Sequence, residues 1–220
     1  MKYLYFTQAE LEVMLELSGG SGHTLYRAGP PPDDAALTKA FATLYQRGFL
    51  SRTEGAFVPT AQGGFFRDMS RAPLAVALTV RRSRNTAALM CYCGGKNIGV
   101  CEPIRTVISE EVRLCLIPAE AVETWIFETG LLEPPALTDA DAQELFQTWN
   151  GTTDSDSIRF RLEQYRNGGE LLSVCEVLSG EGIPLIRFRE NGRESVQPYT
   201  VEALRSMLTC RFRKESQQAL

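Results

Sequence analysis

The sequence has very few of the side chains that catalysis at neutral pH requires. Its single histidine, His23, lies in the loop "GGSGHT", and any Ser-His or Cys-His nucleophile would have to use it. Because this loop follows no strand and has no Lys-Ser/Thr pair after its glycines, it does not match a phosphate-binding loop. We interpret His23 as an exposed loop residue, and we expect no catalytic residues, no cofactor and no enzyme activity.

Long apolar runs are also lacking. No stretch approaches the roughly 18 to 20 apolar residues that a membrane-spanning helix needs. The beginning, "MKYLYFTQAELEVMLEL", has no secretory layout, because Lys2 is its only basic side chain and three glutamates interrupt the apolar positions. We therefore expect a cytoplasmic protein.

The cysteines are the only candidate metal ligands that cluster in the sequence. Cys91, Cys93 and Cys101 lie in "CYCGGKNIGVC", and Cys115 could supply a fourth thiolate for zinc. However, Cys91 and Cys93 point to the same face of a strand, as core residues would, and the two-residue gap typical of zinc sites is absent. We predict buried thiols and no metal site, although the pattern leaves open whether this group ever binds metal.

The first part of the chain has the element order of a winged helix. Thr7 and Glu10 form a capping box for a helix over 8–17, and Asp33 or Asp34 can cap a second helix over 35–47. A hairpin is expected at 49–52 and 56–59, after which Thr60 begins a short third helix. We interpret residues 1–73 as a winged-helix-like segment.

Winged helices often bind DNA, and the charge distribution favours this modestly. The net charge is −4, but residues 34–84 carry eight basic and three acidic side chains, which makes that segment +5. In the second helix, the outward positions include only two cations, Lys39 and Arg47, and Arg52 follows on the wing. Phosphate neutralisation needs several cations, so these three residues are DNA-contact candidates for an alternative function rather than the leading one.

The remainder of the chain has sequence patterns typical of strands and helices. Four short strand-like segments follow Ala75 and lead into a helix that begins near Pro118. Thr138 with Asp141 then begins a new helix, four more strands follow, and Pro198 introduces a closing helix. We predict an α+β fold with antiparallel sheets, in which two quasi-repeated α-ββββ-α units cover about 60–132 and 138–213. The corresponding domain ranges are 74–132 and 138–220, with one continuous domain that includes the first segment as the alternative.

The whole layout resembles the EspG-like chaperones of type VII (ESX) secretion systems. The likeness lies in "FTQAELEVMLELSG", "ALTKAFATLYQRGFL", "RAPLAVALTVRR" and "LIRFRENGRESVQPYTVEALRSML", taken in that order. Members of that bacterial family are cytosolic proteins of two quasi-repeated α/β halves that bind helical secreted substrates. The resemblance implies a protein-binding role in which the sheet and helices of the second half hold a helical partner, and it assigns no individual binding residue.

Two functions follow from these observations. The leading one is a non-enzymatic cytoplasmic adaptor or chaperone that binds an amphipathic helical protein partner through an apolar groove. The alternative is a winged-helix transcription regulator that contacts DNA through Lys39, Arg47 and Arg52 and carries an α/β effector domain. The sequence leaves open the partner's identity, the surface that binds it, and whether the chain forms a homodimer.

Overall fold

The computed structural model describes residues 3–19, 31–81, 86–94, 96–105, 110–149, 151, 158–166, 169–180 and 183–213. The histidine, His23, lies outside these ranges, and so do Arg82 and Arg84, two of the eight basic residues of the segment 34–84. The chain divides into two compact units. Unit 1 comprises Met1–Ala75, Leu89–Ile117 and Asn167–Gly169, and unit 2 comprises Val76–Ala88, Pro118–Arg166 and Glu170–Leu220.

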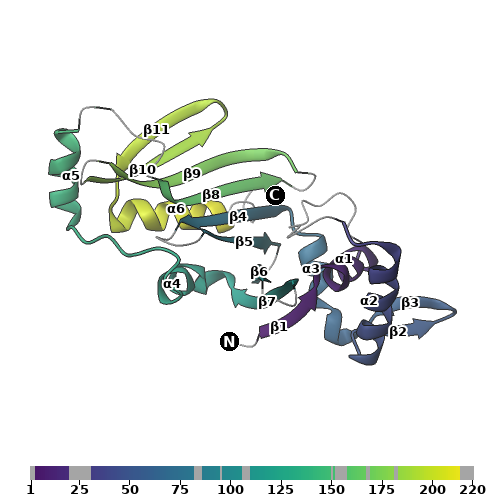
Figure 1. Cartoon of the computed structure of the whole chain (residues 1–220). Helices are drawn as coiled ribbons and strands as arrows, with labels where there is room; N and C mark the ends of the chain where they lie inside the picture. The colour runs from purple at the N-terminus through teal and green to yellow at the C-terminus, as the bar shows by residue number, and fades with distance from the viewer. Residues whose placement is uncertain are drawn as a thin grey trace. The chain divides into compact units, whose positions relative to one another are not determined.

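Unit 1 packs three helices and a hairpin against a set of strands. Its strands are hydrogen-bonded in the order β1-β7-β6-β5, and Figure 1 shows the hairpin β2–β3 beside α2. The elements are β1 (Tyr3–Thr7), α1 (Gln8–Leu17), α2 (Asp34–Gln46), β2 (Leu50–Thr53), β3 (Ala56–Pro59), η1 (Ala61–Gly63), α3 (Phe65–Ser70), β5 (Thr86–Cys93, of which Leu89–Cys93 belongs to this unit), β6 (Asn97–Arg105) and β7 (Glu110–Pro118, of which all but Pro118 belongs to this unit).

Aromatic side chains form the centre of the unit 1 core. Phe6 lies edge-on to both Phe49 and Phe66, with ring centroids 5.2 and 5.3 Å apart, and all three rings are at most 2% exposed. These rings come from β1, from the residue before β2 and from α3. Edge-to-face pairs contribute about 0.5–1.5 kcal/mol beyond the area they bury, so they tie the first strand to the helical part of the unit.

The helix starts in unit 1 follow the local sequence signals. The capping box predicted for α1 is confirmed: Glu10 N donates to Thr7 Oγ1, and Thr7 N donates to the Glu10 carboxylate. Of the two candidates for α2, Asp33 is the N-cap, and it accepts from Ala36 N at 2.8 Å. Thr60 precedes η1 but does not cap it through its side chain, because its hydroxyl donates to Gly48 O at 2.7 Å instead.

Unit 2 has strands in the order β4-β8-β9-β10-β11, with α6 running alongside them (Figure 1). Among its helices, α4 contacts α6, whereas α5 contacts the strands β10 and β11. The elements are β4 (Leu74–Arg81, of which Val76–Arg81 belongs to this unit), η2 (Ala119–Ala121), α4 (Val122–Glu128), α5 (Asp139–Gln147), β8 (Ile158–Arg166), β9 (Leu171–Gly180), β10 (Ile183–Glu190), β11 (Arg193–Pro198) and α6 (Val201–Arg213).

The α+β class predicted from the sequence is confirmed, with antiparallel pairing in β1–β7, β5–β6, β8–β9, β9–β10 and β10–β11. The closing helix begins at Val201 rather than at Pro198, which ends β11. The winged-helix interpretation, the internal duplication and the domain ranges 1–73, 74–132 and 138–220 stay predictions. Among the helices of the described residues, none is long and apolar enough to cross a membrane.

Candidate functional site

The cysteines of unit 1 are buried thiols. Cys91, Cys93, Cys101 and Cys115 are each at most 6% exposed. Burial raises the pKa of Cys93 to about 12 and that of Cys115 to about 11. Burial also raises the pKa of Cys91 well above its usual range, and the three other thiols raise it further. In the ranges that the structure describes, no cluster of three or more His, Cys, Asp or Glu side chains has the arrangement of a metal site.

Arg47, a DNA-contact candidate, makes intramolecular contacts. Its guanidinium lies 3.1 Å from the Glu10 carboxylate and donates to Tyr5 O at 2.8 Å. It also stacks over two rings of the aromatic core, 4.8 Å from the centroid of Phe6 and 5.1 Å from that of Phe49. The Arg47 side chain is about one-third exposed, and these contacts direct it toward β1 and the start of α1.

Lys39 and Arg52 are placed differently from Arg47. Both residues are exposed, Lys39 on α2 and Arg52 on β2. Within the described ranges, neither side chain has a hydrogen bond or ion pair. The three DNA-contact candidates therefore do not form one set, because two face solvent and the third joins elements of the core. Their role in DNA binding stays a prediction.

A row of charged side chains crosses the sheet of unit 2. In β-strand register, Arg161, Glu176 and Arg187 stand opposite one another on β8, β9 and β10. Glu176 accepts from Arg161 at 3.1 Å and pairs with Arg187 at 2.6 Å. Glu176 is 1% exposed, so this carboxylate is buried beneath the arginines that neutralise it.

The next row extends the charges to the edge strand. Arg189 on β10 pairs with Glu194 on β11 at 2.8 Å and lies 3.8 Å from Glu176. On β8, Glu163 accepts from Arg161 at 2.6 Å and from the Tyr165 hydroxyl at 2.9 Å. We name the whole set the charged sheet face: Arg161, Glu163, Tyr165, Glu176, Arg187, Arg189 and Glu194.

The opposite face of the same strands is covered by α6. Successive side chains of a strand alternate between the two faces, and Cys175 and Phe188, which stand opposite each other, flank Glu176 and Arg187 in sequence. Arg211 of α6 lies on this side, 5.9 Å from the Phe188 ring. Its backbone carbonyl accepts from the Gln164 amide at 3.0 Å. The charged sheet face is therefore the side of the sheet away from α6.

The exposed part of the charged sheet face consists of alternating signs. The side chains of Arg161, Arg189 and Glu194 are 37%, 43% and 50% exposed. Such a surface can form charge-assisted hydrogen bonds with a partner, but it offers no nucleophile, no general base in a cleft and no metal ligand set.

Sequence reasoning missed this face, although a signal for it existed. In "IRFRLEQYR" and "IRFRE", charged side chains recur at every second position, which is the period of one strand face. Which residues stand opposite one another on neighbouring strands depends on the register, and the sequence does not show the register. In the β8–β9 pair, bulges shift it.

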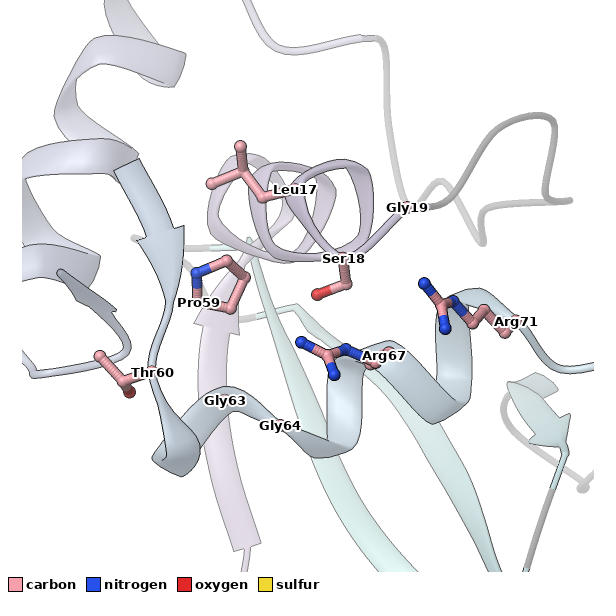
Figure 2. Close-up of a pocket in the computed structure, with 9 residues that line it drawn as sticks. All are labelled: Leu17, Ser18, Gly19, Pro59, Thr60, Gly63, Gly64, Arg67 and Arg71. Atoms are coloured by element: carbon pink, nitrogen blue, oxygen red, sulfur yellow. The ribbon is translucent and has the colours of Figure 1, made fainter. Parts of the chain in front are cut away.

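A small pocket of about 200 Å³ lies within unit 1 (Figure 2). It is formed where the end of α1 meets the segment that joins β3 to α3. Its lining residues are Leu17, Ser18, Gly19, Pro59, Thr60, Gly63, Gly64, Arg67 and Arg71.

Comparison with known proteins gives a likeness in structure alone. No protein-family model matches the sequence, and no curated protein matches it. A solved structure of the Mycobacterium tuberculosis type VII secretion system chaperone EspG5, in complex with the PE25-PPE41 dimer, matches with a TM-score of 0.53. The match covers 96% of this chain and 95% of that chain, at 10% sequence identity. The chain therefore has a fold similar to that of EspG5 over nearly the whole length of both proteins.

Proposed function

We propose that this protein is a chaperone-type adaptor that binds a protein partner through the charged sheet face of unit 2. The observation that carries the proposal is the likeness of fold to EspG5 over 96% of the chain, since that chaperone was solved with a protein dimer bound. A fold can serve several functions, so the proposal also rests on the geometry of the charged sheet face.

The geometry of the charged sheet face suits a helical partner. Neighbouring strands lie about 4.8 Å apart, and residues three or four positions apart on a helix are about 4.5–6 Å apart along its axis. A helix laid across β8, β9 and β10 can therefore present one polar side chain to each strand. The alternating arginines and glutamates would then fix its register by charge complementarity.

The DNA-binding alternative has weaker support from the geometry. Arg47 is engaged with Glu10 and Tyr5 O, and mixed charges on the sheet face do not attract a polyanion. Lys39 and Arg52 are the exposed candidates, and two cations neutralise few phosphates.

The proposal is tested by capturing the partner and reconstituting the complex. The tagged chain is purified from lysate of its source cells, and proteins recovered in stoichiometric amounts are identified by mass spectrometry. Each is then purified alone, its helix content is measured by circular dichroism, and its affinity is measured by calorimetry. We expect a predominantly helical protein that binds the purified chain directly. Recovery of no stoichiometric partner, or of proteins that do not bind when purified, contradicts the proposal.

The surface is tested by two matched charge reversals. Glu194→Arg removes the partner of Arg189 on the charged sheet face, whereas Glu123→Arg removes the partner of Arg205 between α4 and α6. Each breaks one ion pair at the protein surface, so their effects on stability are similar and small. We expect Glu194→Arg to weaken partner binding about tenfold and Glu123→Arg to leave it unchanged. The reverse result places the partner on the helices instead.

A further inference from the structure

Two arginines lie side by side on the wall of the unit 1 pocket. Arg67 belongs to α3 and Arg71 follows its last residue, so the two are one helical turn apart. Both residues are exposed, and Figure 2 shows both guanidinium groups turned toward the end of α1. Within the described ranges, neither forms an ion pair, and no acidic side chain lines the pocket.

Ser18 adds a hydroxyl group that has no partner. The residue is 7% exposed, and among the described residues its Oγ has no hydrogen-bond partner. Its position is fixed, because its carbonyl accepts from the buried Ser70 hydroxyl at 2.9 Å. In Figure 2 the Ser18 hydroxyl points toward the side of the pocket formed by Arg67. A buried hydroxyl without a partner is unfavourable, and a hydrogen bond to a ligand oxygen would offset that cost.

The backbone amides near the pocket are already used. Gly63 N donates to Thr60 O at 3.0 Å and Gly64 N donates to Ala61 O at 3.2 Å. A ligand would therefore be held by the three side chains and not by an amide nest. Guanidinium groups bind oxyanions through paired N–H donors, and the pocket far exceeds the roughly 10–15 Å³ that one water needs.

We propose that this pocket binds a phosphate group, either free phosphate or a phosphomonoester. Two guanidinium groups match the nearly double negative charge of phosphate at neutral pH, whereas a carboxylate would neutralise only one of them. The Ser18 hydroxyl donates to a third oxygen. Nothing in this proposal depends on the protein-binding role of unit 2.

The negative end of the α1 dipole gives a simpler reason for one of the arginines. A Cβ added at Gly19, just past the end of α1, would lie 3.9 Å from Arg71 Nε and Nη2, so Arg71 is near the last carbonyls of that helix. A cation there is favourable. This accounts for Arg71 but leaves Arg67 and the unpartnered Ser18 hydroxyl unexplained.

The test is calorimetry on the full chain at neutral pH and low ionic strength, with inorganic phosphate and O-phosphoserine as separate probes. We expect at least one probe to bind, and the tighter of the two identifies the source of the phosphate group. Arg67→Gln and Arg71→Gln should each weaken binding about tenfold, and Ser18→Ala about fivefold, in line with the loss of one charged or neutral hydrogen bond.

The matched control is Arg193→Gln, which removes one exposed positive charge from β11 in unit 2. It should leave the affinity unchanged. Arg67→Gln and Arg193→Gln should keep the wild-type unfolding temperature in chloride buffer, and Arg71→Gln should lower it only by the small amount that its position near the end of α1 contributes. The proposal is overturned if neither probe binds, if acetate at equal ionic strength binds as tightly as phosphate, or if Arg193→Gln weakens binding as much as the pocket variants do.

Discussion

The two units differ in where they bury charged groups. Unit 1 buries the four thiols Cys91, Cys93, Cys101 and Cys115, which are neutral and behave as small apolar groups. Its one buried carboxylate in the described ranges, Glu10, lies at a helix start and is held by Thr7 N and Arg47. Unit 2 buries a carboxylate in the middle of its sheet, between arginines of two other strands.

This difference indicates a division of roles. Buried ion pairs are weak contributors to stability, because the cost of removing two charges from water offsets their attraction. Well-packed apolar side chains at the Glu176 and Arg187 positions would stabilise the sheet as well or better. Departures of this kind from the rules of stable folding concentrate at functional surfaces, and this one underlies the face that we propose binds the partner.

Glu176→Gln should be the most destabilising substitution. It leaves Arg187, which is 8% exposed, without the charge that compensates it, and breaking a buried pair typically costs about 3–5 kcal/mol. Urea unfolding followed by tryptophan fluorescence measures this directly, since Trp125 and Trp149 both belong to unit 2. The exposed Glu194→Gln is the matched control and should cost less than about 1 kcal/mol. Equal losses for the two variants would contradict a buried charge network.

Alkaline pH should destabilise unit 1 through its thiols. The folded pKa of Cys93 is about 12, above the ordinary value of 9.0, so the thiol's contribution is complete below pH 9 and is lost as the pH rises toward 12. The unfolded chain releases the proton first, and the free energy of unfolding falls by about 1.4 kcal/mol per pH unit in this window. Urea unfolding between pH 8 and 11 should show a shallower decline for Cys93→Ala, and an unchanged slope would be evidence against the buried thiol.

Arg47→Gln should cost about 2 kcal/mol. The variant loses two hydrogen bonds and the stacking over Phe6 and Phe49, and it leaves buried Glu10 with one fewer donor. Chemical unfolding of the variant measures the loss, and Arg52→Gln, which removes an exposed charge from β2, should change stability by less than about 0.5 kcal/mol. If the two substitutions are equivalent, Arg47 does not stabilise unit 1.

The smallest effects are expected at the two helix caps. Thr7→Ala removes one bond of the capping box beside buried Glu10, and Thr138→Ala removes the bond to Asp141 N at an exposed helix start. Loss of a cap costs about 0.5–2 kcal/mol. Because the Thr7 site is part-buried, we expect about 1.5 kcal/mol there and about 0.5 kcal/mol at Thr138, measured by thermal unfolding. The opposite order would contradict the view that the α1 start is part of the unit 1 core.

Local features could be predicted from the sequence, and features that depend on distant contacts could not. The caps at Thr7, Asp33 and Thr138 involve residues three positions apart, so the sequence shows both partners at once. For Arg47, helical periodicity predicts an outward side chain. Its partners Tyr5 and Glu10 lie about 40 positions earlier, and only the fold brings them together.

The candidate site depends on the same distinction. The charges of β8 and β10 alternate visibly in the sequence, but only strand register shows that Glu176 on β9 joins them. The phosphate pocket combines Ser18 with Arg67 and Arg71, which are about 50 residues apart in the chain. No spacing pattern links them. The fold class was accessible from sequence, whereas β1, which no sequence pattern indicated, and both candidate sites required the structure.

Carboxyl footprinting of the complex locates the surface that binds the partner. The purified chain, alone and bound to its captured partner, is labelled at exposed carboxylates, and the extent of labelling at each site is measured by mass spectrometry. We predict that Glu163 and Glu194 of the charged sheet face lose most of their labelling in the complex, while exposed Glu54 and Asp68 of unit 1 keep theirs. Protection of Glu54 and Asp68 with unchanged labelling of Glu163 and Glu194 would contradict the account.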